Sequence, residues 1–429
     1  MPPALRRAAR VVAAAAALLM CAARPAPAAD GVTEWSLLAD SVANGSANWH
    51  TMVIMHQAMH DARNAAQPAY ARWFPPAADE PPGAGAAPDA AMAAAARRVL
   101  AVEHPASLAA IEQTYQAALA RMADGPARQA GAALGDSVGA AALARRRDDG
   151  FHSVRPFPTD KAPGRWRPTP PEFLNSNTTD TAPFLFGSDA ELDPQPPPAT
   201  GTPRFQEVVA EVRRIGSLES PARTSPQSEA AVYWAYQSSQ RGYIHLAAAL
   251  LEAHPRPGGT AAHARAMAQL ATAMADSAVL IWDVKERFGY WRPVTVIRSG
   301  TPGTEQDRDW LPLVETPAHP EYPSGHASDC FTGSDVLRAV FPDLQGPVTY
   351  VAQAGRPPEG PDAGGMGQHM QYADSGLPAR REFAGLAEMA RDCSDSRIWA
   401  GAHFRSANEE SERLARLISD RALAAVPAR

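Results

Sequence analysis

The chain has 429 residues, 45% of them hydrophobic, and a formal net charge of −6. A chain of this size can bury a large core, and its alanine runs with few β-branched residues favour α-helices over strands. The mildly negative charge, without any basic block, argues against nucleic acid as a partner. We therefore expect a helix-rich protein with two structural units.

The first 29 residues have the pattern of a secretory signal peptide. Arg6, Arg7 and Arg10 precede an apolar run over residues 11–20, and Ala26-Pro27-Ala28 resembles a cleavage site. The apolar run is too short to cross a bilayer. We expect an exported protein, periplasmic or secreted, without a membrane span. The pair Arg6-Arg7 leaves twin-arginine export open.

Export would expose the two remaining cysteines, Cys330 and Cys393, to an oxidising compartment. The sequence leaves two alternatives open, a single disulfide or two buried thiols in a helical core.

Residues 30–155 are expected to form an N-terminal helical bundle. Helical patterns cover residues 35–64, with an interruption at 44–46, and then 89–102, 106–123 and 127–149. Within the first of these, His56 and His60 lie one turn apart on one face. A zinc-protease helix would need a glutamate where Gln57 stands, so we interpret the two histidines as core or interface residues.

Residues 156–204 differ in composition and are expected to form an ordered loop. The aromatic residues Trp166, Phe173, Phe184 and Phe186 lie there among a dozen prolines. Loops of this length are either functional or disordered, and the aromatic residues argue against disorder. We expect the loop to pack over the second bundle. Whether it forms a wall of the site or only a strap stays open.

The C-terminal helical bundle, residues 205–429, is expected to carry the site. Helical patterns cover residues 206–214, 227–253 and 260–285. The last pattern ends at Lys285, with Trp282 one turn earlier on the same face.

Three short motifs in this bundle together indicate an oxyanion site. Glycine in the central motif lets a ligand approach the backbone, and the helix start that follows it favours an anion. Cations on both sides would bind oxyanion oxygens, one histidine is placed to move a proton, and the other can attack or ligate the central atom. The spacing of the third motif predicts its arginine and histidine on nearly one helical face. The motifs are Lys285 with Arg292-Pro293, Pro323-Ser324-Gly325-His326, and Ser396-Arg397 with His403.

At these residues the chain resembles the superfamily of vanadium-dependent haloperoxidases and type 2 phosphatidic acid phosphatases, over roughly residues 260–410. The resemblance implies an all-α fold with the site inside a helical bundle. It implies His326 as the acid–base group and His403 as the covalent ligand of vanadium, or as the nucleophile in a phosphatase. The residues that it implies as oxyanion ligands are Lys285, Arg292, Ser324, Gly325 and Arg397.

Further positions resemble the haloperoxidase branch. Trp282, three residues before Lys285, is similar to a tryptophan of haloperoxidases, and His319 falls where bromoperoxidases carry a second histidine. One position departs from the family, because Ala407 stands where an aspartate usually supports the ligating histidine. Asn408 or a backbone carbonyl is the expected substitute.

The resemblance implies three alternative functions. The favoured one is oxidation of halide, bromide before chloride, by hydrogen peroxide at a vanadate cofactor, with an organic molecule as acceptor. The second is phosphomonoester hydrolysis through a phosphohistidine at His403, which needs no cofactor. The third is a non-catalytic oxyanion-binding protein. The sequence leaves the halide, the acceptor and the oligomeric state open.

Overall fold

The computed structural model of the chain describes residues 31–43, 48–153, 160, 162–168, 178–235, 238–353 and 379–428. In these residues, thirteen α-helices (α2 to α14), three short 3₁₀ turns and one two-stranded sheet make up the regular structure. The fold is therefore all-α, as the sequence predicts. The expected signal segment, residues 1–29, lies outside the described residues. The stretch Gly31–Arg429 is one compact unit by its internal contacts.

The N-terminal helices pack closely because alanine and glycine line their contacts. They are α2 (Gly31–Val42), α3 (Asn48–Ala66), α4 (Pro88–Glu103), α5 (Leu108–Ala120) and α6 (Pro126–Arg146). Helices α3, α4 and α6 pack against one another, and α3 also packs against α10. A Cβ atom on Gly135 of α6 would lie 2.0 Å from the carbonyl oxygen of Ala91 on α4. Glycine is needed there for the two helices to approach so closely.

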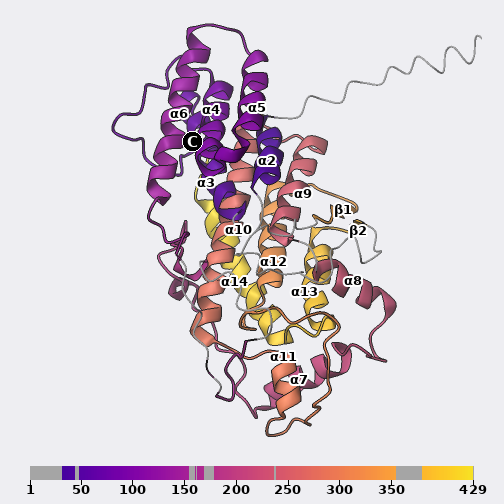
Figure 1. Ribbon diagram of the computed structural model, residues 1–429. Helices are drawn as coiled ribbons and strands as arrows, with labels where there is room; N and C mark the ends of the chain where they lie inside the picture. Colours follow the sequence, from indigo (N-terminus) through magenta and orange to yellow (C-terminus); the bar gives the residue numbers. More distant parts are fainter. Residues whose placement is uncertain are drawn as a thin grey trace, which may run out of the picture. The chain divides into compact units, whose positions relative to one another are not determined.

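The C-terminal helices surround a central pair. They are α7 (Pro203–Ile215), α8 (Ser225–Ala235), α9 (Ser239–Ala253), α10 (Thr260–Phe288), α11 (Pro293–Ser299), α12 (Gly325–Val340), α13 (Leu386–Trp399) and α14 (Arg405–Ala424). Figure 1 shows α10, α12 and α14 side by side, and the three helices contact one another. The expected helix over 227–253 is in fact two, α8 and α9. Ser238 caps α9 by accepting a hydrogen bond from the Arg241 N–H, which starts a new helix there.

Helix α10 is the axis of the core. Every residue from Ala266 to Ile281 is buried, so the helix is enclosed on all sides. A helix that is apolar all round belongs inside a protein, and its many alanines let neighbours approach. One buried apolar cluster contains residues of both the 30–155 and the 205–429 ranges, including Met55 of α3 and Met274 of α10.

The insertion between α12 and α13 contains a small antiparallel sheet. Its strands are β1 (Val348–Val351) and β2 (Arg380–Phe383), and Val348 pairs with Phe383. Val348 and Tyr350 are buried while Thr349 and Val351 are exposed, the alternation of a strand with one face on the core.

The described parts of the proline-rich loop are ordered and lie on the C-terminal helices. Asp276 of α10 accepts hydrogen bonds from the backbone N–H groups of Phe184 (2.5 Å) and Leu185 (2.9 Å). The buried Trp166 donates its backbone N–H to the carbonyl of Gly289 at 2.7 Å. These hydrogen bonds fasten the loop to the helix that carries Lys285. Phe173 lies outside the described residues.

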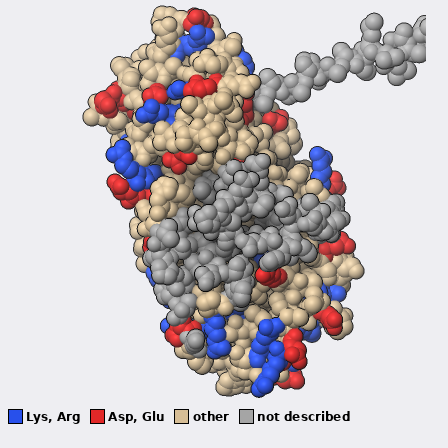
Figure 2. All heavy atoms as spheres, viewed as in Figure 1, with Lys and Arg blue, Asp and Glu red and all other residues tan. Residues whose placement is uncertain are grey.

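Figure 2 shows one face of the molecule, on which positive and negative side chains of described residues lie interspersed. Ion pairs between elements contribute to such a pattern, and Arg405 reaches Glu211 at 2.7 Å and Asp395 at 2.9 Å. Exposed pairs of this kind add little stability each, so the fold depends on its core. Among the described helices, none is both long and apolar enough to cross a bilayer.

A disulfide joins α12 to α13. Cys330 and Cys393, both fully buried, are bonded to each other, which decides between the two alternatives that the sequence left open. Cys330 lies four residues after His326 and Cys393 four residues before Arg397. The bond therefore links the two helices close to the ends that carry the expected site residues.

Replacing both cysteines with alanine should lower the free energy of unfolding by about 2–4 kcal/mol, because the bond restricts the unfolded chain. The sequence separation that it closes is 63 residues. Urea unfolding measures the change, and chemical reduction of the wild type should produce a similar shift. The double variant is the control for reduction, since it has no such bond to lose. An unchanged unfolding midpoint in the variant would contradict this stabilising role.

Candidate oxyanion site

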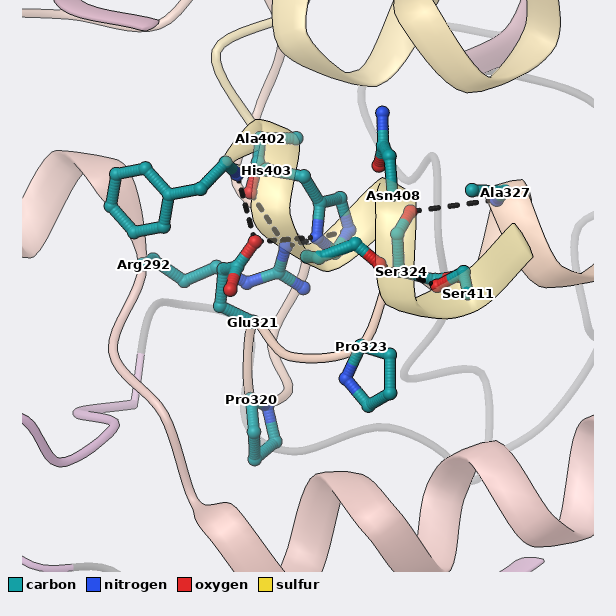
Figure 3. Close-up of polar contacts among 12 residues, drawn as sticks. Arg292, Pro320, Glu321, Pro323, Ser324, Ala327, Ala402, His403, Asn408 and Ser411 are labelled. Carbon is teal, nitrogen blue, oxygen red and sulfur yellow. Dashed lines mark hydrogen bonds and ion pairs between the residues drawn. The ribbon is translucent and has the colours of Figure 1, made fainter. Parts of the chain in front are cut away.

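The three motifs meet where five helix ends converge. Lys285 lies in the last turn of α10, and Arg292 is the residue before α11. Ser324 caps α12, whose first turn carries His326. The other two motif residues, Arg397 in the last turn of α13 and His403 just before α14, complete the group. All of these side chains are buried. Figure 3 shows His403, Arg292 and Glu321 turned toward one another.

Arg397 and His403 do not lie on one helical face, so this expectation was wrong. Helix α13 ends at Trp399, and the chain turns at Gly401, whose φ is +76°. The N–H groups of Ala402 and His403 both donate to the Arg397 carbonyl, at 3.1 and 3.2 Å. The left-handed conformation of Gly401 ends the helix and swings His403 back toward the site. A Cβ atom at 401 would also lie 2.5 Å from the Gly216 carbonyl oxygen.

The two ring nitrogens of His403 have different partners, and these assign the tautomer. Nη1 of Arg292 lies 3.0 Å from Nε2, and Oε1 of Glu321 lies 3.0 Å from Nδ1. Since a guanidinium can only donate, Nε2 is the acceptor and Nδ1 carries the proton. Burial lowers the pKa of His403 well below its ordinary value, and the charges of Arg292, Lys285 and Arg397 lower it further. The ring is therefore neutral near pH 7, with its lone pair on Nε2.

Glu321 is the residue that sequence reasoning missed. Its Oε1 accepts both the Nδ1 proton of His403 and the backbone N–H of Phe404, the latter at 2.8 Å. Burial raises the pKa of Glu321 to about 7, against the opposing effects of Arg292, the Phe404 N–H and Lys285. The available signal was a carboxylate two residues before the motif Pro323-Ser324-Gly325-His326. Its partner lies 82 residues away, so spacing could not reveal the pair.

Glu321, and not Asn408, supports the His403 ring at Nδ1. Ala407 leaves the usual carboxylate position empty, but the Nδ2 group of Asn408 donates to the Ser394 carbonyl at 2.6 Å. Asn408 thus ties α14 to α13, whereas Glu321 supports His403 from a different segment. A hydrogen bond to the far nitrogen fixes the orientation of a ligating histidine and raises its basicity.

Arg292 is held in place from three sides. Its Nε donates to the His319 carbonyl at 2.9 Å, and Nη1 donates to the Ala402 carbonyl at 2.8 Å. Nη2 lies 3.0 Å from Nδ1 of His319. The ring of Trp282 packs on His319, with the two centroids 4.5 Å apart. Trp282 and His319, both expected around the site, therefore form the wall that positions Arg292.

Lys285 holds the loop that leads into α12. Its ammonium group donates to the carbonyls of Pro320 (3.0 Å), Glu321 (3.1 Å) and Pro323. Burial lowers the pKa of Lys285 well below its ordinary value, and the charge of Arg292 contributes in the same direction. In this conformation the lysine acts on an anion at the helix start by its charge.

A cavity of about 130 Å³ reaches the site from outside, and its lining includes Gly325, His326 and His403. A Cβ atom on Gly325 would meet nothing within 4 Å, so open space lies against the backbone there. The Nε2 atom of His326 is buried and has no hydrogen-bond partner among the described residues. The cavity is also lined by Thr178 of the proline-rich loop, whereas Lys285, Arg292 and Arg397 are buried and are not among its lining residues.

These features fit a tetrahedral or trigonal-bipyramidal oxyanion such as vanadate or phosphate. Cations and the N–H groups of a helix start can donate hydrogen bonds to the anion, and the lone pair of the neutral histidine can bond to its central atom. Space for the anion lies at Gly325. Among the described residues, no three side chains of histidine, cysteine, aspartate or glutamate gather as ligands for a bare metal ion. The residues present therefore suit an anion bonded to His403 and surrounded by Lys285, Arg292 and Arg397.

Comparison with known proteins shows similarity to vanadium-dependent haloperoxidases. Residues 265–428 match the family model described as the VCPO second helical-bundle domain. No curated protein matches the sequence. Among solved structures, the first bacterial vanadium-dependent iodoperoxidase superposes with a TM-score of 0.68 at 20% identity, covering 93% of this chain and 95% of that one.

Two further structures are those of bacterial vanadium-dependent chloroperoxidase. The apo form gives a TM-score of 0.61 at 16% identity, covering 87% of this chain and 92% of that one. The holo form gives 0.59 at 17% identity, covering 93% of each chain. At these identities the likeness establishes a shared fold.

Replacing Arg397 with alanine should weaken the binding of vanadate or phosphate by about 1.5–3 kcal/mol, the range for hydrogen bonds to charged groups. Arg397→Lys should recover only part of the loss, because lysine cannot bind an oxyanion in a bidentate way. Isothermal titration measures both affinities, and circular dichroism checks the fold. Unchanged affinity in Arg397→Ala would make Arg397 a purely structural residue.

Replacing Glu321 with glutamine should weaken vanadate binding about 10- to 100-fold, the usual effect of removing the partner of a ligating histidine. The amide is neutral, so it accepts the Nδ1 proton of His403 less strongly. Asn408→Ala is the matched control, since its amide is bonded to Ser394. Equal losses in the two variants would contradict the assignment of Glu321.

Proposed function

We propose that this chain is a vanadate-dependent haloperoxidase that oxidises halide with hydrogen peroxide, and the family model over residues 265–428 and the shared fold support the proposal. One observation carries the proposal. Burial keeps the His403 ring neutral, and Glu321 and Arg292 fix its orientation, with the Nε2 lone pair facing Arg292. This is the form that can bond to the central atom of vanadate.

The residues around His403 would hold the cofactor by charge and hydrogen bonds. Arg292 and Arg397 would share the negative oxygens, and the Gly325 N–H at the start of α12 would donate to another. Lys285 would add its charge through the loop that it holds. Bound vanadate supplies the electrophilic centre at which peroxide is activated toward halide.

His326 is placed to remove the proton from incoming peroxide. Its Nε2 is buried, lines the cavity and has no partner among the described residues. Burial lowers the pKa of His326 well below its ordinary value, and Arg397, Lys285 and Arg292 contribute in the same direction. At neutral pH the ring is therefore a base that can accept a proton.

The second candidate function is that of a phosphatase that uses the same oxyanion site. In that reaction Nε2 of His403 would form a bond to phosphorus as the P–O bond of the ester breaks, and His326 would protonate the departing oxygen. The depressed pKa of His326 disfavours this at neutral pH, because the ring would have to begin protonated. A histidine that starts neutral suits removal of a proton from peroxide better than protonation of a leaving group.

We propose bromide before chloride as the halide, on the resemblance of His319 to the second histidine of bromoperoxidases. The fold alone does not set this preference, since the compared structures are of an iodoperoxidase and of chloroperoxidase. In this chain His319 packs between Trp282 and Arg292, so it can affect the charge around the anion.

We also propose that the protein is exported, with residues 1–29 as the signal. The disulfide between Cys330 and Cys393 supports the proposal, because such bonds persist in oxidising compartments.

The purified protein with added vanadate should brominate a phenolic dye in the presence of peroxide and bromide, and chloride should serve poorly. His403→Ala should abolish the activity, since the cofactor would lose its only covalent attachment. Parallel assays measure dye bromination and hydrolysis of a phosphomonoester on one sample, with vanadium content determined by metal analysis. Rapid ester turnover without any bromination would move the protein to the phosphatase reading. Vanadate binding with neither activity would favour a non-catalytic oxyanion-binding protein.

A further inference from the structure

The cavity has a second polar group that the proposed chemistry does not use. Asp329 lies three residues after His326 on α12 and lines the same cavity. Residues three apart lie on one face of a helix, so the carboxyl group follows the histidine along one wall. Asp329 remains partly exposed, in contrast to Lys285 and Arg292.

The N-terminal end of α9 completes this group. Ser239 donates its hydroxyl to Oδ2 of Asp329 at 2.7 Å, and the Gln240 amide lies 3.5 Å from Oδ1. Both residues line the cavity beside Asp329. A carboxyl group offers about four acceptor positions, so it keeps capacity for a ligand after these two contacts and the hydrogen bond from Ser277. The carboxyl group is thus held in place and still able to bind.

Two tryptophans also contribute to the lining of the cavity, Trp49 from α3 and Trp282 from α10. The cavity of about 130 Å³ also includes the oxyanion end at Gly325 and His403, so a single ring is the largest acceptor that its size suggests. Aromatic walls with one polar group that fixes orientation are typical of a small-molecule site.

A hydroxyl group suits this carboxyl group in either protonation state. Burial raises the pKa of Asp329 to about 7, against the opposing effects of Ser239, Gln240 and Ser277. Near neutral pH both the carboxylate and the acid are therefore populated. A hydroxyl can donate to the first and accept from the second, whereas an ammonium group could only donate.

We propose that Asp329, with Ser239 and Gln240, forms a binding subsite for the organic acceptor, a single-ring phenol whose hydroxyl group lies on the Asp329 carboxyl and whose ring lies between Trp49 and Trp282. The subsite deepens the proposed function and rests on it for the reaction, while the binding itself does not depend on halide oxidation. It orients a ring carbon toward the end of the cavity that holds His326 and His403.

The reaction at this subsite balances with the reagents of the proposed function. Peroxide, halide and one proton give hypohalous acid and water. The ring then forms a carbon–halogen bond as the halogen–oxygen bond breaks, and the ring C–H bond breaks as its proton leaves with the hydroxide as water. A hydrogen bond from the phenol to the Asp329 carboxylate increases the electron density of the ring and favours this step.

Binding of 4-fluorophenol, followed by ¹⁹F NMR on the full protein without peroxide, tests the subsite directly. Asp329→Ala should weaken binding about tenfold or more, since it removes a hydrogen bond to a charged group. Asp329→Asn keeps the shape of the side chain and should show an intermediate loss, which guards against misfolding of the alanine variant. Fluorobenzene, which has no hydroxyl group, should bind the wild type and Asp329→Ala equally weakly.

Asp335→Asn is the matched control. Asp335 lies on the same helix, pairs with Arg338 at 3.3 Å and is not among the residues that line the cavity. It should leave 4-fluorophenol binding unchanged. Equal affinity of the wild type and Asp329→Ala for 4-fluorophenol would overturn the proposal. So would equal affinity of the wild type for 4-fluorophenol and fluorobenzene.

A product measurement separates this subsite from the proposed function. The enzyme with vanadate, bromide and peroxide is given phenol and 1,3-dimethoxybenzene together, and the ratio of brominated products is compared with that from reagent hypobromous acid. The wild type should favour phenol beyond the reagent ratio, and Asp329→Ala should return to it. A wild-type ratio equal to that of the reagent overturns the acceptor role. Absence of any bromination refutes the proposed function and leaves the NMR test of the subsite in force.

Discussion

The burial of three basic side chains at one site, together with the carboxyl group of Glu321, is the constraint on which the site depends. Taking Lys285, Arg292 and Arg397 out of water is costly, and their mutual repulsion adds to the cost. The fold offsets it with backbone carbonyls, three on Lys285 and two on Arg292, and with the charge of Glu321. Among the described residues, Glu321 is a carboxyl group whose charge acts on both Lys285 and Arg292, so an oxyanion bound here would add negative charge to a site rich in basic groups.

The fold keeps the basic residues in place because they lie at the ends of helices whose other turns are packed in the core. Helix α10 is enclosed from Ala266 to Ile281, and it delivers Lys285 just beyond that stretch. The proline-rich loop is fastened to the same helix through Asp276 and reaches the cavity at Thr178. A site built in this way can keep cations at fixed positions without a ligand, which is the requirement for electrostatic preorganisation.

Local patterns in the sequence predicted the helices and the set of motif residues, because a helix period and a short motif are each contained in a few neighbouring residues. The partner of His403 could not be predicted in this way, since Glu321 approaches from a loop 82 residues earlier. The position of His403 also depended on Gly401, whose left-handed backbone breaks the helical period assumed for Arg397 and His403. The partner and the position of His403 thus depend on a contact of high sequence separation and on a single glycine, and motif spacing reveals neither of them.

Under the proposed function the chain would make hypohalous acid, and the disulfide would then affect how long the enzyme stays active. Thiols are among the groups that such an oxidant attacks first, and oxidation of a thiolate beyond the sulfenic acid is largely irreversible. Cleavage after the expected signal would remove Cys21 and leave two cysteines, and these are bonded to each other inside the core. The mature chain would then have no free thiol next to the site for hypohalous acid to oxidise. Repeated turnover would therefore not inactivate the enzyme by thiol oxidation.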